Sequence, residues 1–430
     1  TVLFFIYVLH IIKAKRSNNQ TMAALLRRLS LRTSSSTSPK VVVTTCRKAA
    51  DVLMATTTTA SPKSIENMEK SLDNLHILLF EAPYSPKGGA ETHKSSSSTS
   101  STNGATQTNT NTNDTPTTTN PITTTLVTLI VSEEIDLFLS VVLIIKHLNF
   151  EHRKLVAILF NHFYRSEESF RNYVVSKIPL LDFIFSGYSP EQRDVCINLH
   201  SIAHNCIKKD KRIAEWFLNS RHLPLMFSNY CMSGDFEVQS KAFTIFSTTL
   251  KLYPKTTANF IKKNPNEFFD AYNTTLKQGN YVVQVQFLKL LGELLVVRKF
   301  RKIMAIYVNR KENLMPIMKL LRAKSNNIQF EAFHVFKIFV ANPNKEERVE
   351  YVFKSNVQKL IKFMNKFLND KCTEDEDLYD ERNTVIETLK EMEMEKTKEE
   401  NKNQEQEETK EGGKSVLPLP LPLPLPLPLP

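Results

Sequence analysis

Apolar residues recur with a helical period in the C-terminal half of the chain, and one nine-residue pattern returns every 45 residues. It occupies residues 238–246, 283–291 and 328–336, and a weaker copy covers 194–202. In the second copy the apolar positions are three or four residues apart, as on one buried face of a helix; they are Val283, Phe287, Leu290, Leu291 and Leu294. A helical period of about 40–47 residues is typical of HEAT and armadillo repeats. The predicted fold class is therefore all-α, a HEAT/armadillo-like helical-repeat solenoid without a sheet.

Residues that typically end or begin helices support this 45-residue repeat. Gly234 with Asp235 and Gly279 with Asn280 are again 45 residues apart, each combining a helix stop with a capping side chain. Ser189 before Pro190 resembles a third helix start. We expect two stacked helices in each repeat.

The composition predicts five segments. Residues 1–48 form a basic low-complexity leader, and 49–84 form short helices. Residues 85–125 are a Ser/Thr/Asn insertion expected to be disordered, and 126–394 form the scaffold domain. Residues 395–430 form a charged tail that ends in Leu-Pro pairs.

The net charge of +11 does not indicate nucleic-acid binding, because residues 1–50 contribute nine of these positive charges and contain no acid. The five cysteines include no CxxC pair, which favours a reducing compartment and a cytoplasmic location. The leader also has the Arg-rich, Ser/Thr-rich, acid-free composition of a mitochondrial transit peptide, so a mitochondrial location stays the alternative. No segment has the length and apolarity of a membrane span.

Motifs for chemistry are absent from the sequence. No GxGxxG or GxxxxGK[ST] loop occurs among the nine glycines. Cys196, His200 and His204 recur every four residues, but the glutamate of an HExxH motif is missing, so a repeat face explains them better than a metal site. The acidic stretch 374–381 lacks the central glycine of a calcium loop. We expect no metal, no cofactor and no enzymatic activity.

Several segments carry a resemblance to a known family. The strongest is 327–344 (NIQFEAFHVFKIFVANPN), accompanied by LLGELL at 290–295, ENL at 312–314 and KLI at 359–361. They resemble the calcium-binding protein 39, or Mo-twenty-five, kinase-scaffold family. The likeness is most specific over about 280–370 and weaker from 126 to 279.

The resemblance implies a non-catalytic scaffold that binds sterile-twenty kinases and STRAD-type pseudokinases and activates or positions them. In fungi such relatives serve cell-polarity kinases. It implies that Tyr281 and Lys289 bind the partner on the inner face, and that Met318 and Lys359 line a pocket for a C-terminal Trp-Glu-Phe tail. It also implies that Arg298 contacts a further kinase. From the charge of the tail, we expect Lys289 to support its binding as well.

Two positions depart from the family pattern. Val285 stands where the family has an arginine for the kinase domain, and Arg301 stands where it has a phenylalanine beside Arg298. A generic armadillo-type cargo or transport adaptor is the alternative function. It would favour a ladder of asparagines on the inner face, which the sequence does not indicate.

Overall fold

The computed structural model describes residues 38–55, 61–81, 121–132 and 136–411. Every regular element within these ranges is a helix, which confirms the predicted all-α helical-repeat fold. Most of the predicted leader, most of the insertion and the Leu-Pro tail lie outside the described residues. The chain divides into two compact units, Thr1–Thr257 and Ala258–Pro430, where the sequence predicted one scaffold domain.

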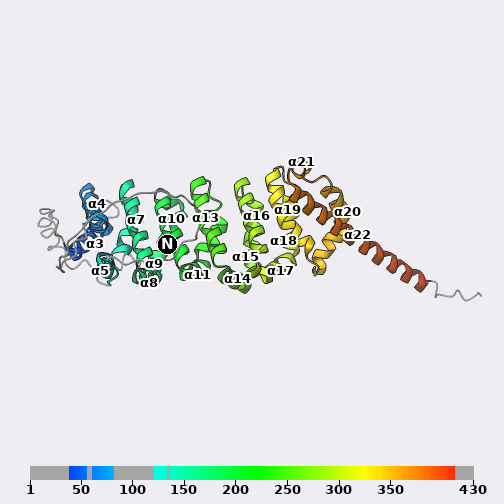
Figure 1. Cartoon of the computed structure of the whole chain (residues 1–430), viewed down its shortest axis with the longest axis horizontal. Helices are drawn as coiled ribbons and strands as arrows, with labels where there is room; N and C mark the ends of the chain where they lie inside the picture. Colours follow the sequence, from blue (N-terminus) through cyan, green and yellow to red (C-terminus); the bar gives the residue numbers. More distant parts are fainter. Residues whose placement is uncertain (1–37, 56–60, 82–120, 133–135, 412–430) are drawn as a thin grey trace, which may run out of the picture. The chain divides into compact units, whose positions relative to one another are not determined.

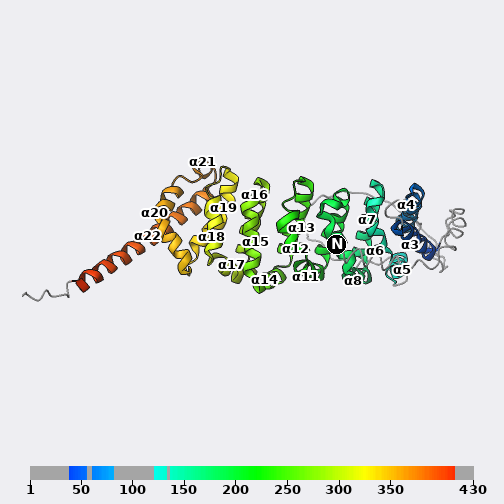
Figure 2. The same cartoon turned by 180° about the vertical axis from the view of Figure 1, so that it is seen from behind.

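In unit 1, helices from successive repeats pack against one another. α3 contacts α4, α4 contacts α7, α7 contacts α10, and α10 contacts α13; the last three helices stand side by side in both views (Figures 1 and 2). The elements are α3 (Pro39–Ala55), α4 (Pro62–His76), η2 (Ile77–Glu81), α5 (Pro121–Ile130), α6 (Leu137–Leu143), η3 (Ile145–His147), α7 (Phe150–Ser166), α8 (Glu168–Ser176), α9 (Ile178–Phe185), η4 (Ser186–Tyr188), η5 (Pro190–Val195), α10 (Cys196–Lys209), α11 (Lys211–Asn219), α12 (His222–Leu225), η6 (Met226–Tyr230) and α13 (Phe236–Leu252).

Unit 2 continues the same construction after a boundary that falls inside α14. α16 packs on α15 and α19, α18 packs on α15, α19 and α20, and α22 packs on α19 and α20. The elements are α14 (Pro254–Lys263), α15 (Pro265–Gln278), α16 (Tyr281–Val296), η7 (Arg298–Phe300), α17 (Arg301–Val308), α18 (Lys311–Leu320), α19 (Asn326–Ala341), α20 (Glu347–Met364), α21 (Asn369–Cys372) and α22 (Glu376–Glu411).

The structure moves two predicted segment limits. The predicted boundary after residue 48 falls inside α3, which begins at Pro39 and buries Val42, Val43 and Cys46. The composition did not reveal this apolar face, because the residues around it are rich in Ser, Thr and basic side chains. The charged run after 394 continues α22 to Glu411 rather than forming a separate segment.

The 45-residue period appears directly in the helix starts. α13, α16 and α19 begin at Phe236, Tyr281 and Asn326, so consecutive starts are 45 residues apart. Asp235 Oδ1 accepts hydrogen bonds from the backbone N–H groups of Glu237 (2.9 Å) and Val238 (3.2 Å), so this predicted cap is confirmed.

The other two predicted helix starts differ from each other. Asn280 Oδ1 accepts from the N–H of Val283 at 3.0 Å, as predicted. A Cβ on Gly279 would come within 2.6 Å of the Val283 side chain, so a glycine is needed there. Ser189, in contrast, precedes the short 3-10 helix η5, and α10 begins only at Cys196.

The predicted apolar stripes form the core. All five stripe residues of α16 are buried, as are Ile328, Ala332, Val335, Phe336 and Phe339 of α19. The Phe287 ring packs on Tyr272 of α15 at 5.1 Å between centroids, and Tyr272 donates a hydrogen bond to the Phe287 carbonyl at 2.7 Å. The Phe333 ring packs on Phe367 at 5.4 Å. Aromatic contacts between successive elements therefore contribute to the packing of this core.

Phe287→Ala and Phe333→Ala should each lower the free energy of unfolding by about 3–5 kcal/mol, because both rings are fully buried. The measurement is denaturant unfolding. Phe236→Ala is the control, since this ring is 69% exposed. Unfolding curves of the two core variants that coincide with the parent would show that the helix phase is wrong.

The histidine stripe of α10 is part of a packed repeat face. The rings of His200 and His204 stack with centroids 5.5 Å apart, and His200 Nδ1 lies 3.1 Å from the Tyr188 hydroxyl. Burial, together with the charge of Lys241 and the neighbouring His204, lowers the pKa of His200 to about 3. His200 is therefore neutral in the folded protein at neutral pH.

The free energy of unfolding should fall as the pH drops below 6.5. The unfolded chain then binds a proton at residue 200 that the folded protein takes up only near pH 3, so the slope is at most about 1.4 kcal/mol per pH unit from this group. Unfolding measured at pH 7 and pH 5 should show a smaller loss for His200→Gln than for the parent. His76→Gln, outside this cluster, is the control. A loss of the same size in the parent and in His200→Gln would refute this assignment.

Candidate functional site

Three surfaces of unit 2 carry the residues that the sequence singled out. Tyr281 and Lys289 lie on α16, Met318 lies on α18 and Lys359 lies on α20, while Arg298 lies on η7. The structure therefore groups these residues by surface and does not join them in one pocket.

The first surface is the outward row of α16. Tyr281 is 49% exposed, Val285 is half-buried, and Lys289 is exposed. The three residues are spaced four apart and do not belong to the buried stripe, so they lie in a row on one face of α16. This agrees with the outward orientation predicted from the sequence.

Side chains from two other helices extend this surface. Asn327 Nδ2 of α19 donates a hydrogen bond to the Tyr281 hydroxyl oxygen at 2.9 Å. Lys371 Nζ of α21 donates to Asn327 Oδ1 at 3.2 Å and lies 5.0 Å from the centroid of the Phe330 ring. Tyr281 is thus connected to two helices that are distant in sequence.

A partly buried glutamate of α19, Glu331, lies within electrostatic reach of the same surface. Burial raises the pKa of the Glu331 carboxyl, and the nearby Glu293 acts in the same direction, whereas Lys289 and Lys371 oppose the rise. Lys289 therefore acts electrostatically on Glu331. We group it with Tyr281 rather than with Met318 and Lys359.

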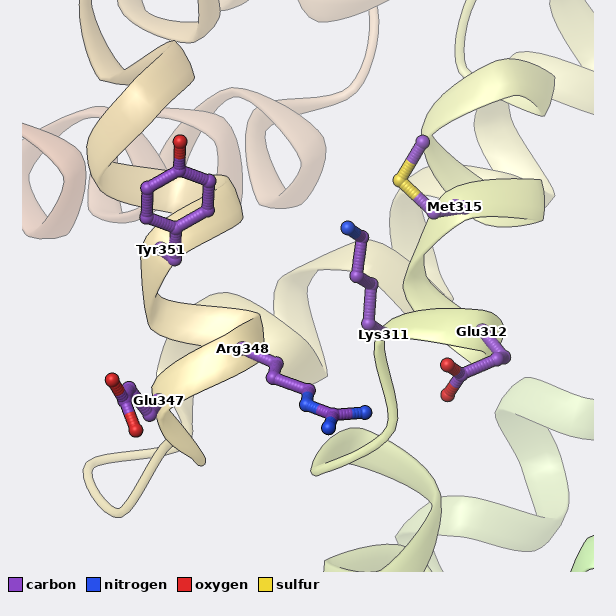
Figure 3. Close-up of a pocket in the computed structure, with 6 residues that line it drawn as sticks. All are labelled: Lys311, Glu312, Met315, Glu347, Arg348 and Tyr351. Atoms are coloured by element: carbon purple, nitrogen blue, oxygen red, sulfur yellow. The ribbon is translucent and has the colours of Figure 1, made fainter.

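The second surface is a groove between α18 and α20. A cavity of about 580 Å³ opens there, and Figure 3 shows side chains from both helices around it. Two large apolar side chains are exposed at its walls, Met315 at 48% and Tyr351 at 69%. The lining residues are Lys311, Glu312, Met315, Glu347, Arg348 and Tyr351. The cavity combines apolar walls with two cations and two carboxylates.

Met318 and Lys359 lie further along the same two helices and do not line the cavity itself. Met318 is half-buried and Lys359 is exposed. Met318 follows Met315 by three residues, and Lys359 follows Tyr351 by eight, so each pair shares a helix face. The groove residues Met315 and Tyr351 were missed in the sequence. Their helical spacing from Met318 and Lys359 places them on the same helix faces, but it does not show that their side chains are exposed.

Polar contacts hold the start of α18 in place. Arg310 Nη2 pairs with Asp270 Oδ1 of α15 at 3.1 Å. The fully buried Asn313 accepts from Asn273 Nδ2 at 2.7 Å and donates to the Tyr307 carbonyl at 2.8 Å. The side of the groove formed by α18 is thereby anchored to α15 and α17.

Arg298 belongs to a third, basic surface. It is exposed together with Lys299, Arg301 and Lys302, while Phe300 between them is buried. Within the described residues none of these four cations forms an ion pair.

The described ranges contain no group of three or more His, Cys, Asp or Glu residues that could hold a metal ion. No helix in them is long and apolar enough to cross a membrane. The five cysteines are free and buried, and burial raises the pKa of the Cys46 thiol to about 12.

Comparison with known proteins gives a consistent result. The family model described as Mo25-like matches residues 30–393. A Mo25-like protein of Schizosaccharomyces pombe is 37% identical over 254 residues, covering 57% of this chain and 74% of that protein. Calcium-binding protein 39-like of Homo sapiens is 34% identical over 249 residues, covering 57% of this chain and 72% of its own length.

Among solved structures, an engineered protein matches with a TM-score of 0.38 and 14% identity, covering 59% of this chain and 97% of its own. That likeness is too weak to support an argument. The family model matches most of the chain, and two relatives that are more than 30% identical are each covered over more than two thirds of their length. The chain therefore belongs to the Mo25-like family.

Proposed function

We propose that this protein is a non-catalytic cytoplasmic scaffold that binds sterile-twenty kinases or STRAD-type pseudokinases and activates or positions them. Membership of the Mo25-like family supports a scaffold role in general. Activation by such a protein requires tighter binding to the active conformation of the kinase than to the inactive one.

The groove between α18 and α20 is the observation that carries the proposal. Met315 and Tyr351 expose apolar surface beside Lys311 and Arg348, and Lys359 is exposed further along α20. A tail of the Trp-Glu-Phe kind offers two aromatic rings, a side-chain carboxylate and a terminal carboxylate. Its rings fit the apolar walls, and its charges suit the surrounding cations.

The row of α16 is the second contact in this proposal. A kinase domain would bind Tyr281 and Lys289 while its tail occupies the groove. Two linked contacts raise the overall affinity, because the second binding event becomes intramolecular. Val285 offers no charge at the position of the family arginine, so the tail contact has to supply a larger part of the affinity here.

Met318→Ala should reduce the affinity for a peptide ending in Trp-Glu-Phe at least about tenfold. Met318 lies beyond the cavity on the face of α18 that carries Met315, where its flexible thioether adapts to an aromatic ring of a tail that extends along the groove. Loss of a side chain that anchors a partner typically costs about 2 kcal/mol or more. Fluorescence anisotropy with a labelled peptide measures the effect. Because Met318 is only half-buried, its loss should destabilise the fold far less than Phe333→Ala does.

Met304→Ala is the matched control, since Met304 is a half-buried methionine on α17, which is not one of the two helices that form the groove. It should leave peptide binding unchanged. If the parent protein does not bind the peptide, or if Met318→Ala binds it equally well, the tail-pocket proposal is wrong and the family assignment alone stands.

Lys359→Ala should weaken peptide binding strongly at low ionic strength and little at high ionic strength. Both partners of this contact are exposed, and salt screens such charges over about 10 Å at 0.1 M. Titrations at two salt concentrations give the comparison, with the exposed Lys277 of α15 changed to alanine as the control. An effect of Lys359→Ala that does not change with salt would contradict a role as a charge partner.

A further inference from the structure

A continuous polar chain crosses the α16 surface and ends at Tyr281. It runs from Lys371 of α21 through Asn327 of α19 to the tyrosine hydroxyl, with contacts of 3.2 Å and 2.9 Å. The Phe330 ring lies 5.0 Å from the Lys371 ammonium, and Lys371 is itself half-buried. The chain therefore starts from a cation that its surroundings hold in place.

The chemistry of this chain sets the direction of its hydrogen bonds. An ammonium group can only donate, so the Asn327 atom that faces Lys371 has to be the amide oxygen. The amide nitrogen then faces Tyr281 and donates to its oxygen. The orientation of an asparagine amide is often ambiguous, but here the lysine determines it. Asn327 thus occupies an acceptor site of Tyr281, and among the described residues the phenolic hydrogen is not donated to another side chain or carbonyl.

We infer that Tyr281 acts as a hydrogen-bond donor to an acceptor oxygen of the bound kinase domain, and that Asn327 and Lys371 are positioning residues for it. This inference rests on the proposed function. If Tyr281 instead served only as an apolar contact, the orientation of the Asn327 amide would not matter to binding.

The same row indicates what kind of partner surface fits. Lys289, two turns beyond Tyr281, can also only donate, and eight residues of helix span about 12 Å. Glu331 lies within electrostatic reach of Lys289 and Lys371 and is partly buried. The partner surface should therefore present two acceptors, carboxylates or free carbonyls, one opposite Tyr281 and one opposite Lys289, which are about 12 Å apart along the helix axis.

Asn327→Asp tests the inference with almost no change of shape. A carboxylate at this position accepts from Lys371 and also from the Tyr281 hydroxyl, so it takes up the hydrogen that the partner needs. We expect Asn327→Asp to weaken binding about five- to tenfold, the size of one lost neutral hydrogen bond, and Tyr281→Phe to do the same. The double variant should bind no more weakly than either single variant.

The melting temperature of Asn327→Asp separates a positioning role from a purely structural one. If Asn327 were only structural, the substitution would lower stability and binding together. Asn327→Asp adds an ion pair with Lys371, so its melting temperature should equal or exceed that of the parent while its binding falls. Asn326→Asp is the matched control, because it adds the same charge on the neighbouring exposed residue. This control should bind as the parent does.

The probe is the purified kinase domain of a human STRAD pseudokinase, titrated against the full chain by isothermal calorimetry. A parent protein that does not bind the probe overturns the proposed function and the inference together. A parent that binds, with Asn327→Asp or Tyr281→Phe binding equally well, overturns the donor role alone. The same holds if Asn327→Asp loses stability and binding in parallel, or if Asn326→Asp weakens binding as much.

Discussion

The structure depends on the inability of a single helix pair to cover its own apolar stripe. The stripe of α16 is buried where this helix packs on α15, α17 and α19. Burial of this kind supplies most of the stability of a repeat protein, and each repeat relies on its neighbours for it. The same constraint places the candidate site, because burying Phe287 and Leu291 turns Tyr281 and Lys289 outward on a helix of 3.6 residues per turn.

Polar contacts between helices then give these outward residues a defined geometry. Asn313 is fully buried and bonded to two neighbouring elements, so the start of α18 has little freedom. Lys371 and Asn327 do the same for Tyr281 at the surface. A binding surface that is ordered before the partner arrives loses less conformational entropy on association. The two proposed contacts therefore lie on side chains that the fold orders before any partner binds.

Much of the fold was predictable from local chemistry. The capping oxygens of Asp235 and Asn280 bond within three residues of themselves, so the chain around them contains all the information for these helix starts. The start of α3 was not predictable in this way, because its buried valines stand in a Ser/Thr-rich, basic flank that composition alone assigns to a leader. Of the candidate site, the exposed row on α16 followed from helix phase. The apolar walls at Met315 and Tyr351 did not, since an exposed methionine and an exposed tyrosine differ from buried ones only through their neighbours.

The sequence by itself determined the 45-residue period, the helices, the buried stripes and the direction in which each stripe faces. These properties depend on residues three, four or seven positions apart, which a helix always brings to one face. Only the tertiary structure decided which side chains meet across helices. Asn327 reaches Tyr281 from 46 residues away and Lys371 reaches Asn327 from 44, because stacked repeats place corresponding positions side by side. Which of these neighbours bond to one another depends on the packing distance and rotation between helices, and no local spacing encodes that.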